Sequence, residues 1–341
     1  MTHYRIALLG FGNVGQSLAR LLLRKGDQLK HDHNLTFTIT AIATARHGMA
    51  IDPNGINVEH ALQLITNHNK LDVLSTHPRI TNAMEFIGSC GADVLFENTS
   101  VNYTDGQPAV DYLRTALHAG MHAITANKGP VVHAFQELTR IAEKFGCKFY
   151  FESAVMDGAP IFSLFRESLP TATLHSLSGI LNSTTNLILS RMESGETFEQ
   201  ALAYAQSIGI AETDPSGDID GWDAAVKVAA LVTVLMGTPL KPAQVDRAGI
   251  RNLTLDDIHQ ATRQGMRWKL VCTAWHEGAE VHGRVRPELV GADSPLYGVN
   301  GTSSIVTFET DVLPQLSIVE GNPGPETTAY GLLADFINAT R

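Results

Sequence analysis

The stretch YRIALLGFGNVG, residues 4–15, decides how the first half of the chain is expected to fold. An apolar run of strand type leads directly into a GxGxxG pattern. The QSLARLLLRKG that follows has the spacing of a helix. A glycine-rich turn between a strand and a helix is the setting in which such a pattern binds a dinucleotide. The alternative is a glycine turn with no ligand.

Each residue of this turn has an expected task. Gly10 permits the tight turn, Gly12 lets the backbone approach a pyrophosphate, and Gly15 lets the helix pack closely on the strand. Asn13 and Val14 lie at the start of the helix, where free N–H groups and the positive end of the dipole would meet the phosphates.

Further strands and helices alternate as far as residue 151. Strand-like runs lie at 37–43, 93–100, 121–125 and 148–151, and helical patterns lie at 108–120 and 135–145. This alternation predicts an α/β fold with a Rossmann-type, doubly wound parallel sheet. Thr99 and Ser100 end one of these strands and Lys128 follows another, so they are expected at the ligand-binding carboxyl edge of the sheet.

The end of the second strand bears on the choice of cofactor. An NAD-binding unit usually carries an acid there to hold the ribose hydroxyls. Here the chain continues as TARHG, residues 44–48, with no acid and one arginine. Arg46 can form a charge-assisted fork to a 2′-phosphate, which favours NADP(H) and leaves NAD(H) as the alternative cofactor. An exposed arginine with no ligand is the other interpretation.

The second half differs in character and contains an acid-rich stretch, AQSIGIAETDPSGDIDGWDAAVK, residues 205–227. It is either a solvated turn or a binding site. Asp223 and Lys227 are four residues apart and share a helix face. The helix is apolar on nearly every side, so Lys227 must be paired, deprotonated or directed into a cavity. We interpret the pair as a candidate acid/base site.

The composition excludes several classes of protein. The chain has 341 residues, and a formal net charge of −10 argues against a nucleic-acid partner. Cys90, Cys147 and Cys272 form no CxxC and are expected to be reduced thiols. The apolar run 228–240 is too short to span a membrane. The N-terminus leads directly into a strand with no signal peptide, which predicts a cytoplasmic protein.

These motifs resemble those of the homoserine dehydrogenase family. The acid-rich stretch matches the family signature from Ala205 to Lys227. The supporting motifs follow in the family's order: GFGNVG at Gly10, NTS at Asn98, TANKGP at Thr125, ESAVMDGAP at Glu152 and GILNSTTN at Gly179. The resemblance covers essentially the whole chain. It implies NAD(P)H-dependent reduction of L-aspartate 4-semialdehyde to L-homoserine, in the biosynthesis of threonine, methionine and isoleucine.

The resemblance also implies roles for individual residues. Lys227 would be the general acid of the reduction and the base of the reverse reaction, and Asp223 would orient it. Glu212 would bind the substrate's ammonium group, and Thr184 and Asp218 would shape the same pocket.

Further roles follow from the cofactor and loop motifs. Lys128 would lie between nicotinamide and substrate, and Gly324 is the expected cofactor contact in the late loop EGNPGPETTA, whose prolines depart from the family's glycines. The backbone carbonyls of the 152–160 loop would bind Na+ or K+, unless that loop is merely structural. The carbonyls concerned are those of Glu152, Val155, Asp157 and Ala159.

The family organisation sets the expected domains. Residues 1–151 with 322–341 would form the dinucleotide-binding domain, and residues 152–321 an α+β substrate and dimerisation domain with a mixed sheet. A homodimer, a small-molecule substrate and no membrane partner are expected, and the end of the chain at residue 341 predicts no regulatory domain. Two alternatives stay open: a related oxidoreductase acting on another semialdehyde or 3-hydroxy acid, and a nucleotide sensor that lacks catalysis.

Overall fold

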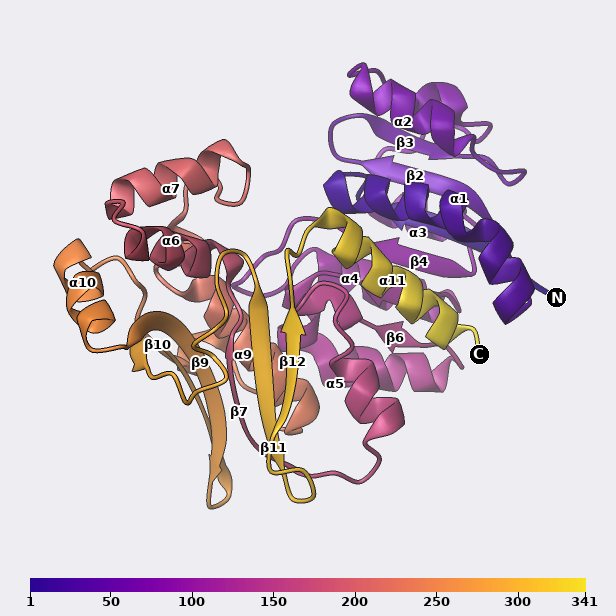
Figure 1. The fold of residues 1–341 in the computed structure, drawn as a ribbon. Coiled ribbons are helices and arrows are strands. Elements are labelled where there is room, and N and C mark those ends of the chain that lie inside the picture. The colour runs from indigo at the N-terminus through magenta and orange to yellow at the C-terminus, as the bar shows by residue number, and fades with distance from the viewer. The chain divides into compact units, whose positions relative to one another are not determined.

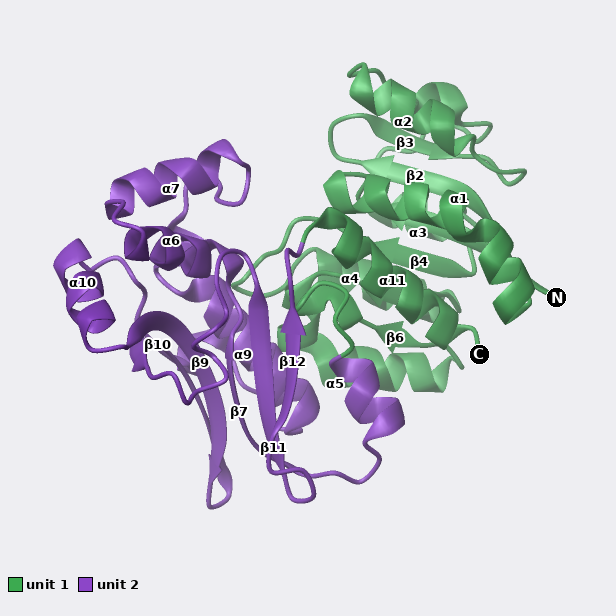
Figure 2. Ribbon diagram, in the orientation of Figure 1, with its two compact units in different colours: residues 1–160, 324–341 green, residues 161–323 purple.

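The computed structural model describes residues 1–341 as two compact units (Figure 2). Unit 1 comprises Met1–Pro160 and Gly324–Arg341, and unit 2 comprises Ile161–Pro323. Each unit contains one six-stranded sheet. The predicted fold class, a Rossmann-type sheet plus a second unit with a mixed sheet, is confirmed. None of the helices is both long and apolar enough to cross a bilayer.

Unit 1 is built on a sheet of order β3-β2-β1-β4-β5-β6 (Figure 1). Its strands are β1 (Thr2–Leu9), β2 (Leu35–Thr44), β3 (Gly48–Ile51), β4 (Val94–Glu97), β5 (His122–Thr125) and β6 (Phe149–Tyr150). Its helices are α1 (Asn13–His33), α2 (Val58–Thr66), η1 (Leu71–Leu74), α3 (Ala83–Ser89), α4 (Ala109–His118), α5 (Lys128–Lys144), η2 (Glu152–Ala154) and α11 (Pro325–Ala339). All neighbouring strands are parallel except β3, which pairs with β2 in the antiparallel sense.

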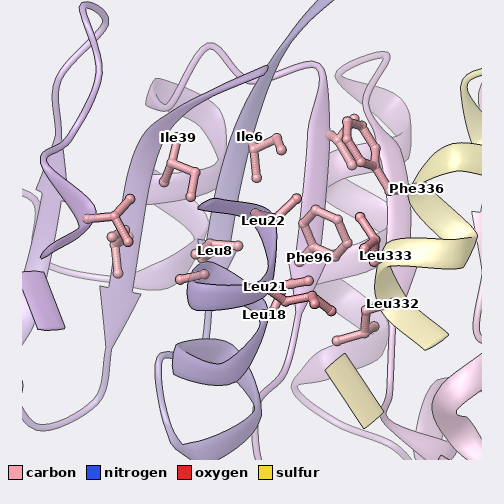
Figure 3. Packing of buried hydrophobic residues seen from close by; sticks show 14 of the residues in the cluster. Ile6, Leu8, Leu18, Leu21, Leu22, Ile39, Phe96, Leu332, Leu333 and Phe336 are labelled. Carbon is pink, nitrogen blue, oxygen red and sulfur yellow. The ribbon is translucent and has the colours of Figure 1, made fainter. Parts of the chain in front are cut away.

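The core of unit 1 explains why the last helix belongs to the first half of the chain. Helices α1 and α11 lie side by side on one face of the sheet (Figures 1 and 3). Leu18 and Leu22 of α1 and Leu332 of α11 are fully buried there, and Phe336 meets Phe96 of β4 edge to face with the ring centres 5.9 Å apart. This apolar contact stabilises α11 on the sheet, although more than 200 residues separate it from β4 in the sequence.

Local differences from the predicted elements have simple causes. The edge strand β3 was not expected, because four residues carry too little periodicity to show as a strand. Helix α5 begins at Lys128 rather than near residue 135, since the Asn127 side chain caps it by accepting from the Gly129 N–H at 3.0 Å. Helix α11 begins at Pro325, because proline is well suited to a first helical position.

The expected boundary at residue 152 is wrong, because the loop of residues 152–160 belongs to unit 1. The Glu152 N–H donates to Oδ2 of Asp335 at 2.7 Å, and the Ser153 hydroxyl donates to the carbonyl of Thr328 at 2.7 Å. These bonds tie the loop to α11. At the other boundary, residues 322–323 fall in unit 2.

Unit 2 has a mixed sheet of order β12-β11-β7-β9-β10-β8. Its strands are β7 (Leu174–Ile180), β8 (Asp246–Arg247), β9 (Arg267–Glu277), β10 (Glu280–Val290), β11 (Ser304–Thr310) and β12 (Leu316–Glu320). Its helices are η3 (Leu164–Ser168), α6 (Ser183–Glu193), α7 (Phe198–Ser207), α8 (Ser216–Ile219), α9 (Trp222–Leu235), η4 (Pro242–Gln244) and α10 (Leu255–Arg263). Only the short pair of β8 and β10 is parallel.

Helix α9 packs directly on the sheet of unit 2. A side chain at Gly283 of β10 would lie 3.0 Å from Val228 of α9, so the glycine permits this close contact. The helix is buried from Asp223 to Thr233 except at Lys227, which matches its expected burial. Residues Leu164–Ser168 form a π-helical turn, and α6 is capped by Asn182, the residue before its first serine.

Lys269 of β9 is a fully buried cation that no sequence pattern indicated. Its ammonium donates to the carbonyl of Val299 at 2.7 Å and to the amide oxygens of Asn186 at 3.1 Å and Asn300 at 3.3 Å. These bonds tie the 296–303 loop and α6 to the sheet. Burial lowers the pKa of Lys269 from 10.5 to about 8.

The buried lysine predicts an unusual dependence of stability on pH. The folded protein loses the Lys269 proton at lower pH than the unfolded chain does, so the wild type should gain stability relative to Lys269→Met as pH rises from about 8 to 10. The gain should approach roughly 3 kcal/mol, at about 1.4 kcal/mol per pKa unit. Urea unfolding across this range measures it.

The exposed Lys241, changed to methionine, is the matched control and should show no such slope. A constant difference between wild type and Lys269→Met at every pH would contradict the assignment of a depressed pKa.

Candidate functional site

The glycine-rich turn forms a cradle at the start of α1. A Cβ on Gly10 would lie 2.4 Å from the Asn98 carbonyl oxygen, and a Cβ on Gly15 would lie 2.2 Å from the Gly10 carbonyl oxygen. Gly12, by contrast, faces open space. Gly10 and Gly15 are thus required by packing, whereas Gly12 leaves room for a ligand to approach the backbone.

The N-terminus of α1 is free to bind an anion. Gly12 provides no side-chain cap, and the first turn, which begins with Asn13 and Val14, contains no acidic residue. The N–H groups of this turn therefore have no side-chain partner, and no carboxylate neutralises the helix dipole. A pyrophosphate fits both features.

An unpaired amide lies beside this cradle. Both polar atoms of the Asn98 side chain are buried and have no hydrogen-bond partner within the protein. Buried amides are normally paired, so this pair of atoms is suited to a ligand. Thr99 is half-buried and Ser100 is exposed at the same carboxyl end of β4, as expected. Together with the open Gly12 backbone, these residues fit a dinucleotide.

Glu97, which the sequence did not single out, organises this edge. It is fully buried at the end of β4 and receives hydrogen bonds from the Thr99 N–H at 2.7 Å, from the Thr99 hydroxyl, and from the Thr125 hydroxyl at 2.7 Å. Burial raises the pKa of Glu97, opposed by these hydrogen bonds. In the sequence, Glu97 looks like any polar residue at the end of a strand. Only its position in the folded protein shows that it organises the sheet edge.

The two predicted cations of unit 1 also lie at the carboxyl ends of strands. Arg46 is exposed in the β2–β3 turn, where its carbonyl accepts a hydrogen bond from Lys70 at 2.7 Å. Lys128 is the first residue of α5, and two residues separate it from the end of β5. A lysine at a helix N-terminus opposes the helix dipole, so its position there is explained better by an anionic ligand than by helix stability.

The remaining predicted positions in unit 1 lie around the start of α11. Gly324 caps α11 with an extended backbone and faces open space. Asp157 of the 152–160 loop accepts a hydrogen bond from the Thr328 hydroxyl at 2.7 Å. Binding of Na+ or K+ by the carbonyls of Glu152, Val155, Asp157 and Ala159 stays a prediction.

The candidate acid/base group lies in unit 2 at the first turns of α9. Nζ of Lys227 is 3.2 Å from Oδ2 of Asp223, and it donates to the Leu181 carbonyl at 2.6 Å. The side chains of Lys227 and Asp223 are only 15% and 11% exposed. The ion pair that the i,i+4 spacing predicts is therefore present, and it is largely removed from water. Such a lysine can deliver a proton to, or take one from, a ligand oxygen.

A second carboxylate lies beside this pair. Asn182, the residue after Leu181, donates from its amide nitrogen to Asp218 at 2.7 Å and to Asp223 at 3.0 Å. Burial raises the pKa of Asp218, and the charge of Asp223 raises it further, while the Asn182 and Thr184 hydrogen bonds lower it. The structure thus brings together four predicted site residues, Thr184, Asp218, Asp223 and Lys227, around one that was missed.

Glu212 lies outside this hydrogen-bonded group. Its side chain is exposed, and its backbone carbonyl accepts from the Gln206 amide at 3.1 Å. The carboxylate has no hydrogen-bond partner within the protein, so it is available to an ammonium group.

The cysteines take no part in this chemistry. All three are buried and free. Cys272 lies in the neighbourhood of Lys227 and Asp223, and burial raises its pKa to about 12. A thiol with such a pKa is a poor nucleophile near neutral pH, which argues against a cysteine-based aldehyde dehydrogenase.

Comparison with known proteins decides the family. Residues 160–337 match the family model for homoserine dehydrogenase, and residues 10–152 match the model for its NAD-binding domain. The chain belongs to the homoserine dehydrogenase family. Similar proteins include an NAD(+)-dependent homoserine dehydrogenase from Pseudomonas canavaninivorans, 33% identical over 99% of this chain and 96% of the relative.

Two further homoserine dehydrogenases extend the comparison. One from Methanocaldococcus jannaschii is 36% identical over 98% of this chain and 97% of its own length. The crystal structure of one from Thiobacillus denitrificans has a TM-score of 0.84 at 28% identity, covering 100% of this chain and 74% of that one. The two matches include the glycine turn of unit 1 and the acid-rich stretch of unit 2.

The glycine cradle of this homoserine dehydrogenase family member predicts opposite effects for two substitutions. Gly15→Ala should lower the free energy of unfolding by about 1–3 kcal/mol, because its methyl group overlaps the Gly10 carbonyl. Gly12→Ala should leave stability unchanged but weaken NAD(P)H binding. Urea unfolding and fluorescence titration with NAD(P)H measure the two effects. Normal cofactor affinity in Gly12→Ala would contradict the assigned cradle.

Proposed function

We propose that the protein is a homoserine dehydrogenase that interconverts L-homoserine and L-aspartate 4-semialdehyde, with Lys227 as its general acid and base. The observation that carries the proposal is the sequestered contact of Lys227 with Asp223 and the Leu181 carbonyl. Two of the three ammonium donors have protein acceptors there, so one is left for a substrate oxygen. The bound nicotinamide cofactor supplies or accepts the hydride.

The other steps, proton transfer and substrate binding, are assigned to residues of the chain. In the reduction, Lys227 donates a proton to the oxygen that becomes the hydroxyl of homoserine, and in the oxidation it takes that proton back. Asp223 keeps the ammonium oriented through their 3.2 Å contact. Glu212 is proposed to meet the substrate's ammonium, Lys128 its carboxylate, and Thr184 and Asp218 to line the pocket. This role for Lys128 is consistent with a cation that opposes its own helix dipole.

The oligomeric state, the pathway and the cellular location are part of the same proposal. We infer a homodimer formed through the sheet of unit 2, where Val319 of β12 and Leu289 of β10 are exposed apolar residues. A cytoplasmic role in the biosynthesis of threonine, methionine and isoleucine follows from the substrate. A nucleotide sensor without catalysis is disfavoured, because it would have no need of a sequestered lysine.

Replacement of Lys227 tests the mechanism. Lys227→Ala should lower kcat for oxidation of L-homoserine by about 10²- to 10⁴-fold, the usual contribution of a positioned general acid or base. NAD(P)H affinity should be retained, since the cradle lies in unit 1. A spectrophotometric assay of cofactor reduction measures turnover.

The exposed Lys241→Ala is the matched control and should turn over at the wild-type rate. The assay should also include other hydroxy amino acids and 3-hydroxy acids. Near wild-type turnover of homoserine by Lys227→Ala would exclude the assigned role, and preference for another substrate would favour the related-oxidoreductase alternative.

We further propose that NADP(H) is the preferred cofactor, with Arg46 contacting the 2′-phosphate. The relative from Pseudomonas canavaninivorans is named as NAD(+)-dependent, so the cofactor preference of this chain has a test of its own. Arg46→Ala should raise KM for NADP+ by roughly tenfold or more, the loss of about one charge-assisted hydrogen bond, and leave KM for NAD+ unchanged. Equal effects on both cofactors, or a wild type that prefers NAD+, would exclude the 2′-phosphate contact.

A further inference from the structure

The side chain of Asn182 uses every hydrogen-bonding position that an amide has. Its oxygen accepts from the N–H and from the hydroxyl of Thr185, both at 2.9 Å, which caps α6. Its nitrogen donates to Asp218 at 2.7 Å and to Asp223 at 3.0 Å. Ionised carboxylates only accept and a backbone N–H only donates, so these partners determine which way the amide points.

The same corner of the chain also holds the lysine. Leu181, next to Asn182, accepts a hydrogen bond from Nζ of Lys227 at 2.6 Å. Two consecutive residues therefore contact all three charged groups of the cluster. Asn182 is only 4% exposed, so water cannot readily replace its amide.

We propose that Asn182 is a positioning residue, whose amide holds Asp218 and Asp223 at a fixed spacing and favours their charged forms beside Lys227. The proposal deepens the proposed function and rests on it for its kinetic test. Asn182 itself need not touch substrate, because its four hydrogen bonds are all made within the protein.

We call the two hydrogen bonds from the Asn182 amide to Asp218 and Asp223 the bridge. It is needed because it holds two like charges close together. Asp218 and Asp223 repel one another in a site with little water, and such a pair readily takes up a proton. The groups that face Asp218 are Asn182, which caps α6, Thr184 of α6, and Asp223 and Lys227 of α9. Two further groups lie near Asp223 and Lys227. Cys272 of β9 is a neutral thiol, and Glu288 of β10 is a further negative charge near that thiol.

Without the Asn182 donor, the carboxylate pair should bind a proton at higher pH. A proton shared between Asp218 and Asp223 would weaken the attraction of Asp223 for Lys227. The ammonium group of Lys227 would then lose its orientation. Activity should therefore fall on the acid side of the pH profile before it falls elsewhere. A residue that merely capped α6 would lower activity equally at every pH.

Two variants separate the bridge from the helix cap. Asn182→Ser keeps an oxygen suited to an N-cap but has no amide donor for the carboxylates. Asn182→Asp keeps the shape and the cap but replaces the donor with a third carboxylate. Thr185→Val is the matched control, because it removes the hydroxyl bond to Asn182 and leaves the bridge intact.

The acid limb of kcat/KM for homoserine should move to higher pH by roughly 1–2 units in Asn182→Ser, the range that a hydrogen bond to a charged group is worth. The shift should be larger in Asn182→Asp and absent in Thr185→Val. An acid limb that stays in place in both Asn182 variants, with activity reduced equally at all pH values, would overturn the proposal.

A measurement without turnover distinguishes this proposal from the proposed function. NMR titration of aspartate labelled with 13C at the side-chain carboxyl, assigned with Asp218→Asn and Asp223→Asn, follows the pair directly. The pair should titrate at higher pH in Asn182→Ser than in wild type, whether or not homoserine is the substrate. Unchanged titration would overturn the bridge, whereas a shifted titration in a protein inactive on homoserine would overturn only the proposed function.

Discussion

The arrangement of unit 2 depends on one constraint, the placement of an ammonium group among carboxylates with little access to water. A lysine on an apolar helix is costly unless its charge is satisfied. Asp223 satisfies it from one helical turn away, at 3.2 Å, and the Leu181 carbonyl satisfies it from the end of β7. Sheet, helix and acid-rich loop must therefore meet at Lys227, which explains why the signature residues cluster there.

Unit 1 presents the complementary case, in which polar groups are left without protein partners. The start of α1 has no side-chain cap, and the Asn98 amide is buried and unpaired. Each of these costs stability in the isolated protein. They are explained together by an anionic dinucleotide, whose binding supplies the partners that the chain lacks. Glu97 organises the same sheet edge by accepting hydrogen bonds from Thr99, which follows β4, and from Thr125 of β5.

Much of this could be predicted from the sequence where the signal is local. The GxGxxG turn, the parallel sheet and the i,i+4 pair of Asp223 and Lys227 depend on residues close together in the chain, and the structure has all three. The 152–160 loop was placed in the wrong unit because its partners, Thr328 and Asp335, lie more than 170 residues away. The residue types of the 152–160 loop do not indicate its hydrogen bonds to α11.

Two of the three missed residues, Asn182 and Lys269, show a further limit. Asn182 precedes a run of serine and threonines that are equally good caps by type, so composition could not choose among them. Its second task, donating to Asp218 and Asp223, depends on residues 36 and 41 positions away. Lys269 lies in a strand whose other residues predict nothing unusual, and its acceptors come from a helix and a loop. Buried polar networks of this kind are visible only after the chain has folded.

The central claim is that Lys227 exchanges a proton with the substrate oxygen. The most direct test is a crystal structure of the full chain with NADP+ and L-homoserine, at a pH that slows turnover. The account predicts that the homoserine hydroxyl lies within hydrogen-bonding distance of Nζ of Lys227, about 2.7–3.2 Å. A homoserine bound with its hydroxyl on another residue, and Lys227 in contact only with Asp223 and Leu181, would contradict it.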